Sequence, residues 1–383
     1  MPPEPASLAR LHAVEASGDE SAVEGPLHGY HHETYVFPLS DAMEDERSGR
    51  WKCREPRADL LWFDRRCFAS EEQLLQALSG LIQGIPDIIQ VGGIGLQRFI
   101  EGHTLGYFHR SGATVPDVYL GQIMTLFRQL VSVRPDALAA DRRCEPDDRP
   151  EDGDTDGFLE RLVHFTEQRV YLANQQRFAG LFEDLGLGAE SFRYLRKNVS
   201  GLRERPFCLL HADLHRENFI VDAMRRLWTI DWELAMFGDP LYDLATHLHL
   251  MRYPARQVRA VVRHWCETVE GVRAGSAGGW EGDLGRLLAY KRAQSVFTDV
   301  IRTALHLDAG PEVGRRQIAP AAFTLRGILA DAALPLGLDP VPGTRRIASA
   351  LVRWCREQGS AAARPAVIPT GPSGAGVRFG RGR

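Results

Sequence analysis

The sequence is poor in lysine, carries little net charge and contains no long apolar run. Lysine accounts for only three of the 46 cationic residues, at positions 52, 197 and 291. The formal net charge of −4 is small for 383 residues and argues against a general nucleic-acid binder. No segment approaches the ~18 apolar residues that cross a bilayer, and the N-terminus lacks the basic-then-apolar order of a signal peptide. We therefore expect no nucleic-acid or membrane partner and, by default, a cytoplasmic protein.

Paired cysteines are also absent. The six cysteines lie far apart and form no Cys-x-x-Cys motif. Such spacing predicts reduced thiols rather than a disulfide framework or a structural zinc site. The cysteines are Cys53, Cys67, Cys144, Cys208, Cys266 and Cys355.

The distribution of residue types divides the chain into four parts. Residues 1–24, rich in Ala, Glu and Ser, predict a flexible or helical leader. Residues 25–101 predict a small lobe built on an antiparallel sheet, and residues 102–360 predict a larger, mostly helical lobe. Residues 361–383 are rich in Gly, Pro, Ala and Arg and predict a disordered tail. The predicted fold class is α+β with two lobes, and a cleft between two lobes is a common place for a ligand.

The expected elements follow from periodicity. β-branched and aromatic residues predict strands in 27–39 and 51–63, and two more in 88–91 and 95–100. Ser70 is a suitable N-cap for a helix with apolar residues at helical spacing. In the second half, a hairpin over 219–231 is the only predicted interruption of helices. The predicted helices cover 117–133, 156–172, 187–202, 241–252, 255–271, 282–306, 319–333 and 344–357.

Three oxygen-bearing side chains in the middle of the chain indicate chemistry. Asp213 and Asn218 can lie on one tight loop, and the hairpin that follows returns the chain so that Asp231 arrives beside that loop. Phosphoryl transfer from ATP needs one carboxylate that orients the attacking hydroxyl and receives its proton. It also needs hard oxygen ligands for Mg²⁺, which an Asp carboxylate and an Asn amide provide. The pattern therefore predicts a phosphotransferase site.

The segments that carry this pattern resemble the aminoglycoside phosphotransferase family. The chain reads His211-Ala-Asp-Leu-His-Arg-Glu-Asn218, then Ile230-Asp-Trp-Glu233, then Gly238-Asp-Pro-Leu-Tyr-Asp-Leu-Ala245. The family has closely similar motifs at all three places. The resemblance implies a bilobal, protein-kinase-like fold and dependence on ATP and Mg²⁺.

The resemblance also implies roles for individual residues. Asp213 would be the catalytic base, and Asn218 and Asp231 would be magnesium ligands. His211 and Asp243 would be buried structural supports, Asp243 by hydrogen-bonding the catalytic loop. Trp232 and His215 are expected to pack and to shape the loop, while Asp222 and Asp239 are expected to be turn residues.

In the N-terminal half, the resemblance implies a lysine that holds the phosphates and pairs with a helix glutamate. Lys52 and Glu71 are the predicted pair, because a lysine in an arginine-rich chain suits a compact phosphate-binding charge. Arg54 lies on the same face of the strand as Lys52, and Glu72 competes with Glu71, so both alternatives stay open.

The segment Gln97-Arg-Phe-Ile-Glu-Gly102 resembles the hinge of the family, where backbone groups hold adenine. By that match, Arg98 and Ile100 would offer the backbone contacts to the nucleotide.

The predicted function is ATP-dependent transfer of a phosphoryl group to a hydroxyl of a small molecule, foremost an aminoglycoside or another antibiotic. A cationic acceptor would suit acids in 145–156, although these also fit a solvated loop. Choline, homoserine and sugars are alternative acceptors. An inactive nucleotide-binding scaffold is disfavoured because all three oxygen-bearing side chains are present. A protein kinase is disfavoured because no Asp-Phe-Gly motif occurs at Asp231.

Overall fold

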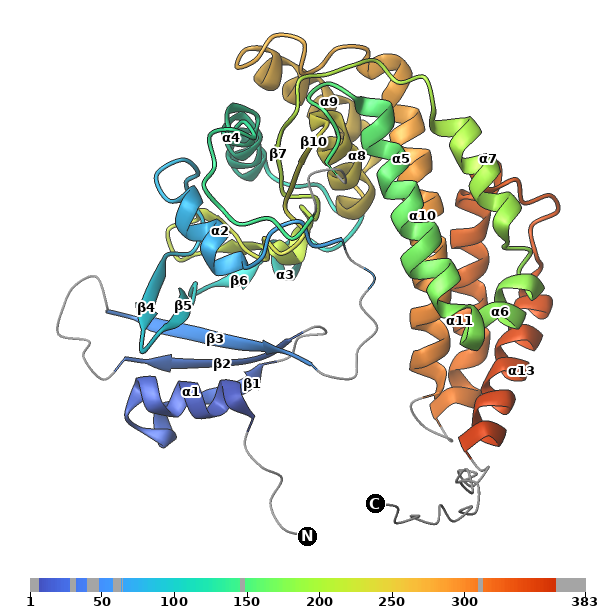
Figure 1. Cartoon of the computed structure of the whole chain (residues 1–383), viewed down its shortest axis with the longest axis horizontal. Coiled ribbons are helices and arrows are strands. Elements are labelled where there is room, and N and C mark those ends of the chain that lie inside the picture. The colour runs from blue at the N-terminus through green and yellow to red at the C-terminus, as the bar shows by residue number, and fades with distance from the viewer. Residues whose placement is uncertain are drawn as a thin grey trace, which may run out of the picture.

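The computed structural model describes residues 7–27, 32–39, 48–57, 63, 65–144, 149–308 and 313–362. The predicted α+β architecture is confirmed: a small sheet lobe precedes a larger helical lobe (Figure 1). The last helix reaches residue 362, and the rest of the predicted tail lies outside the described residues. Within the described ranges, no helix is both long enough and apolar enough to cross a membrane.

The small lobe is an antiparallel sheet between two helices (Figure 1). Its strands are arranged in the order β1-β2-β3-β5-β4. On β3, Trp51 and Cys53 point to one face and pack with Ala9 and Ala13 of α1. Because side chains alternate along a strand, the intervening residues point to the opposite face, where α2 lies. The elements are α1 Leu8–Ser17, β1 Glu24–Leu27, β2 His32–Pro38, β3 Arg50–Pro56, α2 Glu71–Leu78, β4 Ile88–Val91 and β5 Ile94–Arg98.

The large lobe is built from helices around one continuous hydrophobic core. Two of its helices, α3 and α6, lie outside the predicted ones; α6 follows α5 after a π-helical turn at Thr166–Tyr171 and a 3-10 turn at Leu172–Asn174. The helices are α3 Leu105–Phe108, α4 Asp117–Ser132, α5 Thr155–Phe165, α6 Gln175–Asp184, α7 Ala189–Val199, α8 Pro240–Met251, α9 Ala255–Glu270, α10 Trp280–Asp308, α11 Val313–Asp331, α12 Ala333–Leu336 and α13 Thr344–Ala362.

The prediction of a single hairpin within the helical lobe is wrong, because the hairpin is one of two small sheets. The hairpin strands β8 Phe219–Val221 and β9 Leu227–Thr229 form a three-stranded sheet with β6 His103–Thr104. A second sheet pairs β7 Cys208–Leu210 with β10 Met236–Gly238. Such short buried strands lack enough residues to show a period of two. Together the two sheets frame residues 211–218.

Candidate active site

The loop at residues 211–218 is held from beneath by a carboxylate of α8. Asp243 Oδ2 accepts a hydrogen bond from the backbone amide of His211 (3.1 Å), and Oδ1 accepts one from Ala212 (2.8 Å). Burial raises the pKa of Asp243 to about 6, while its two amide donors oppose the rise. Ala212 adopts a left-handed conformation (φ 64°), a strained geometry for alanine. The contacts from Asp243 stabilise the sharp turn that begins the loop.

The ring of His211 fills the inside of the loop. It is fully buried, and its Nε2 lies 3.1 Å from the carbonyl oxygen of Ile230. Its Nδ1 accepts the backbone N–H of Asp213 at 3.3 Å. Burial lowers the pKa of His211 to about 4, so the ring is neutral. Because Nδ1 accepts, the proton resides on Nε2 and is donated to Ile230, which ties the loop to the segment that carries Asp231.

Asp213 and Asn218 are in direct contact. The amide nitrogen of Asn218 donates to the backbone carbonyl of Asp213 (2.9 Å) and to its Oδ2 (3.0 Å). With its nitrogen engaged in this way, Asn218 keeps its amide oxygen for another partner. His215 Nε2 lies 3.4 Å from the same Oδ2. Although burial disfavours its protonation, the hydrogen bond that it donates to Asp213 and the charges of Asp213 and Asp231 raise the pKa of His215.

Asp231 lies beside this pair. The backbone amide of Ile230 donates to the carbonyl of Asn218 (3.0 Å). Asp231 is the next residue in the chain, so its backbone is held close to Asn218. Asp231 has φ 65°, and its side chain remains 38% exposed. Desolvation, the charge of Glu233 and the charge of Asp213 raise the pKa of its carboxyl. A cation placed between the two aspartates would relieve this repulsion.

The predicted pair of Lys52 and Glu71 is not present, and an arginine occupies its place. The Nη2 atom of Arg54 forms an ion pair with Glu71, while its Nη1 lies 3.9 Å from Asp231 Oδ1. The Nε atom lies 3.7 Å from Glu72 Oε1, a longer contact. Lys52 forms no ion pair with any described residue, and burial and the charge of Arg54 lower the pKa of Lys52 to about 8. Of the two alternatives on α2, Glu71 is the residue that joins the site.

Glu71 also connects the small lobe to the strand end that carries Asp231. It is almost fully buried, and its Oε1 accepts the backbone amide of Trp232 at 2.6 Å. Ser70 caps α2 by accepting the amides of Glu72 and Gln73, as expected for a helix N-terminus. The start of α2 therefore orients the backbone next to Asp231.

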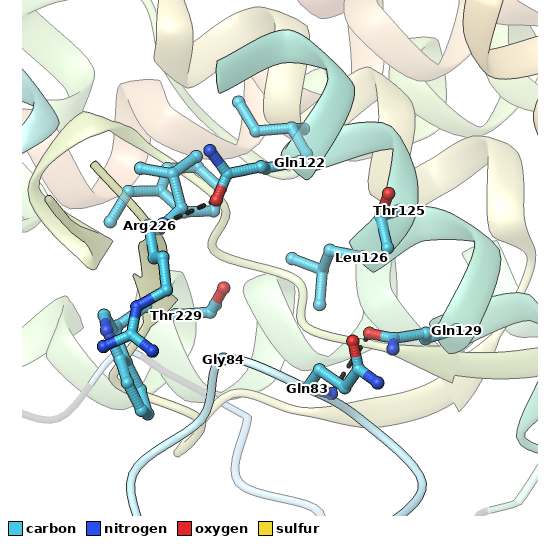
Figure 2. Close-up of a pocket in the computed structure, with 12 residues that line it drawn as sticks. Gln83, Gly84, Gln122, Thr125, Leu126, Gln129, Arg226 and Thr229 are labelled. Carbon is cyan, nitrogen blue, oxygen red and sulfur yellow. Dashed lines mark hydrogen bonds between the residues drawn. The ribbon is translucent and has the colours of Figure 1, made fainter. Parts of the chain in front are cut away.

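Behind the hairpin, α4 and a turn of the small lobe support the strands β8 and β9. Thr229 donates its backbone N–H to the carbonyl of Gly84 (2.6 Å), and Gln122 of α4 accepts the amide of Leu227 (2.8 Å). Gly84 and Gln122 both line a cavity of about 340 Å³, and Figure 2 shows the hydrogen bond that the Gln122 side chain makes there. Asp213, Asn218 and Asp231 do not line this cavity. The hairpin is thus fixed from the side opposite the predicted site.

The two hinge residues have different backbone environments. The N–H of Arg98 already donates to Asp87 (2.8 Å), and the Arg98 guanidinium lies 3.0 Å from the Asp87 carboxylate. A nucleotide contact at Arg98 would therefore use its carbonyl oxygen. The backbone amide of Ile100 has no hydrogen-bond partner in the part of the chain that the structure describes.

Sequence reasoning missed Arg216, which lies inside the loop motif at residues 211–218. Its guanidinium is buried and donates to three backbone carbonyls: Met251 (3.0 Å), His109 (2.7 Å) and Ala113 (2.8 Å). It thereby joins the loop to the end of α8 and to the segment after the hinge. In an arginine-rich chain, nothing in the sequence marks this arginine out.

The model of the phosphotransferase enzyme family matches residues 72–276, just over half of the chain. A choline/ethanolamine kinase family protein from Mesorhizobium loti superposes with a TM-score of 0.50 at 17% identity, covering 90% of this chain and 97% of that one. A macrolide 2'-phosphotransferase from Brachybacterium faecium superposes with a TM-score of 0.46 at 17% identity, covering 85% of this chain and 94% of that one.

An aminoglycoside phosphotransferase in complex with ADP and hygromycin B superposes with a TM-score of 0.45 at 14% identity, covering 91% of this chain and 99% of that one. Among curated proteins, none matches the chain. Since the family model spans more than half of the sequence, the chain belongs to the phosphotransferase enzyme family and is a small-molecule phosphotransferase.

Proposed function

We propose that the protein transfers the γ-phosphoryl group of ATP to a hydroxyl of a small molecule. The observation that carries this proposal is the convergence of Asp213, Asn218 and Asp231 from two neighbouring segments, with Arg54 of the small lobe 3.9 Å from Asp231. A loose phosphoryl-transfer transition state mainly requires positioning and compensation of charge. These side chains provide both at the place where the two lobes meet.

Asp213 is the proposed catalytic base. Asn218 holds one oxygen of its carboxylate at 3.0 Å, which fixes the direction of the other oxygen toward an acceptor hydroxyl. During transfer, the hydroxyl proton passes to Asp213 as the new O–P bond forms. The contact from His215 Nε2 to the same oxygen of Asp213 adds a second constraint on its orientation.

Asn218 and Asp231 are the proposed Mg²⁺ ligands. Both offer hard oxygen atoms; burial and the charge of Glu233 raise the pKa of Asp231, and a bound cation would stabilise its charged form. When bound, Mg²⁺ would supply charge compensation on the phosphates. Within the chain, Glu71 fixes the backbone next to Asp231 through Trp232, so the ligand direction is set before the ion arrives.

Arg54 is the proposed phosphate-binding residue of the small lobe. Its guanidinium is always charged and presents a planar set of donors that fits phosphate oxygens. Its ion pair with Glu71 holds it in the direction of Asp231. Arg98 and Ile100 remain the proposed backbone contacts to adenine, through the carbonyl of the former and the unpaired amide of the latter.

For the acceptor, an aminoglycoside or another antibiotic is the first class that we propose. The three described aspartates of 149–156 do not strengthen that class, because they accept backbone amides of the lobe itself. Asp152 accepts from Phe207 (2.6 Å), Asp154 caps α5, and Asp156 accepts from Gly201 (2.9 Å). They are therefore used as structural caps.

A second class, a neutral or carboxylate-bearing alcohol such as a sugar or homoserine, is favoured by cations between α8 and α10. Lys291 Nζ lies 3.4 Å from the Tyr242 hydroxyl, and its charge stabilises the Asp243 carboxylate beneath the loop. Burial and the charges of Lys291 and Arg252 lower the pKa of His249 to about 4. A polycationic acceptor approaching from this side would meet like charges.

The test is a coupled ATP-consumption screen with aminoglycosides, macrolides, choline, homoserine and simple sugars, followed by variants on the best acceptor. We expect Asp213→Asn to lower kcat by roughly 10²–10⁴-fold while nucleotide binding stays near normal. Asp231→Asn should weaken Mg²⁺-dependent nucleotide binding as well. Full turnover in Asp213→Asn would contradict the mechanism, and nucleotide binding without turnover on any alcohol would favour the inactive scaffold.

A further inference from the structure

Two cysteines that are 77 residues apart in sequence lie together in the fold. The segment before α2 and the segment after α4 form a short antiparallel contact, in which Phe68 pairs with Arg142. Arg143 donates its amide to the carbonyl of Cys67 (3.0 Å). As a result, Cys144 Sγ lies 4.0 Å from that same carbonyl oxygen, and both cysteines line one cavity.

The two thiols have unequal surroundings. Cys67 is buried, whereas Cys144 is partly exposed. The hydrogen bond from Cys67 and the guanidinium of Arg149 lower the pKa of Cys144 to about 5, against its burial. The hydrogen bond with Cys144 and burial raise the pKa of Cys67 well above its usual value. Of the two thiols, Cys144 is therefore the one whose surroundings favour the thiolate form.

Both sulfurs border a small cationic cavity. It has a volume of about 150 Å³, and its lining includes Cys67, Cys144, Arg65, Arg142 and Arg149. Arg149 Nη2 donates to the carbonyl of Cys144 at 2.9 Å, which fixes its charge beside the sulfur. A cavity with this lining admits a small oxidant and stabilises the anion that leaves after attack.

We propose that Cys67 and Cys144 form a redox-active dithiol, in which a hydroperoxide oxidises Cys144 and Cys67 then closes a reversible disulfide. Nothing in the phosphotransfer site requires this pair. A low-pKa, accessible cysteine next to a second thiol is the arrangement that supports such chemistry. The dithiol is not part of a metal site, since no group of three or more His, Cys, Asp or Glu side chains able to hold an ion occurs among the described residues.

The chemistry takes two steps. The Cys144 thiolate attacks one peroxide oxygen, an S–O bond forms as the O–O bond breaks, and the second oxygen leaves as hydroxide, which is protonated to water. The sulfur of Cys67 then attacks the Cys144 sulfenic acid. The S–S bond forms, the S–O bond breaks, and the oxygen leaves as water with the proton of Cys67. Peroxide is reduced, the two thiols are oxidised by two electrons, and a dithiol reductant reverses the result.

The site lies next to elements of the phosphotransfer machinery. Cys67 follows Arg66, whose Nη2 binds Glu233 at 2.7 Å, two residues beyond Asp231. It also precedes Ser70, the N-cap of α2. A disulfide would covalently link the entry to α2 with the segment that follows α4.

The experiment uses the full chain, reduced, desalted and treated with equimolar hydrogen peroxide. Free thiols are then alkylated, and peptides are mapped by mass spectrometry. We expect one Cys67–Cys144 cross-link that dithiothreitol removes. Cys67→Ser should instead accumulate a sulfenic acid at Cys144 that dimedone traps, and Cys144→Ser should form neither product. Cys266→Ser is the matched control, because burial raises the pKa of that partly exposed thiol to about 11, and it should behave like the wild type.

A second measurement needs no variant. In the folded wild type at neutral pH, iodoacetamide should alkylate Cys144 at least roughly tenfold faster than Cys266, because the thiolate is the nucleophile. Equal rates at the two positions, or a peroxide-treated protein whose map lacks the cross-link, would overturn the proposal.

Discussion

At the residue scale, the guanidinium of Arg54 faces two carboxylates through two different nitrogen atoms, whereas a lysine side chain has a single ammonium nitrogen for both. It pairs with Glu71 and also reaches toward Asp231, at 3.9 Å. Lys52, two positions earlier on the same face, has no such ion-pair partner among the described residues, although both cations line one cavity of about 420 Å³. The geometry therefore assigns different surroundings to two cations that alternation alone treats as equivalent.

We expect Arg54→Met to lower kcat/KM for ATP by roughly 10²–10³-fold, because one charge that acts on the phosphates is removed. Lys52→Met is the matched control on the same strand face and should change kcat/KM by less than about tenfold, as expected for a residue outside the transition-state contacts. Steady-state kinetics with the best acceptor measures both. If Lys52→Met lowered kcat/KM more than Arg54→Met does, Lys52 rather than Arg54 would be the phosphate-binding residue.

At the scale of single elements, the β8–β9 hairpin depends on the turn at Gly84. This glycine has φ 69°, and a Cβ atom there would lie 2.7 Å from the carbonyl oxygen of Leu227. Its own carbonyl accepts the amide of Thr229 on β9 (Figure 2). The glycine is required both for its backbone conformation and for the close approach of the two backbones.

Gly84→Ala should therefore destabilise the protein and lower turnover, because the hairpin that carries Asn218 and Asp231 at its ends must move. Gly80→Ala is the matched control: Gly80 has φ 80° but no atom within 4 Å of the added Cβ. We expect about 1–2 kcal/mol of destabilisation in the control, and about 1–3 kcal/mol more in Gly84→Ala from the clash. Urea unfolding measures the difference, and equal losses would show that only the dihedral angle matters.

At the scale of the whole molecule, a buried ion triad connects three distant segments of the large lobe. Arg205 binds Asp239 through two hydrogen bonds of 2.7 Å each and Asp283 through a third of 2.7 Å. The side chains of Arg205 and Asp239 are fully buried. Asp239 was expected to be a turn residue, and it does cap α8, but its carboxylate also joins α8 to the segment before β7 and to α10.

Arg205→Met should cost about 3–5 kcal/mol of unfolding free energy, because two buried carboxylates lose their partner. Arg226→Met is the control: it breaks the pair with Asp222, in which the arginine side chain is 60% exposed, and should cost less than about 1 kcal/mol. Urea midpoints of the two variants make the comparison. A small loss in Arg205→Met would mean that water enters the cavity and solvates the carboxylates.

Long elements with clear periodicity were predictable, and short ones were not. The helix capped by Ser70 and the strands predicted in 88–91 and 95–100, which are observed as Ile88–Val91 and Ile94–Arg98, follow from local spacing. The strands β7 and β10 have only three residues each, too few to show a period of two, so only their pairing identifies them. The helix α6, which follows a π-helical turn, has buried Phe178, Leu181 and Phe182 at helical spacing, so a helical signal was present in the sequence and the prediction missed it.

By itself, the sequence determined the family and the local part of the site. Asp213 and Asn218 are five residues apart, and the turn between them brings their side chains into contact. Their contact could therefore be predicted from their spacing in the sequence. Motif residues of this kind constrain each other through short stretches of backbone, whose conformations are few.

The tertiary structure alone decided which remote side chains meet. Glu71 and Trp232 are 161 residues apart, and Cys67 and Cys144 are 77 apart. The choice of Arg54 over Lys52 also depended on where α2 docks on the sheet. Such contacts arise from the packing of whole elements. The direction in which a side chain points after packing cannot be predicted from the residues next to it in the sequence.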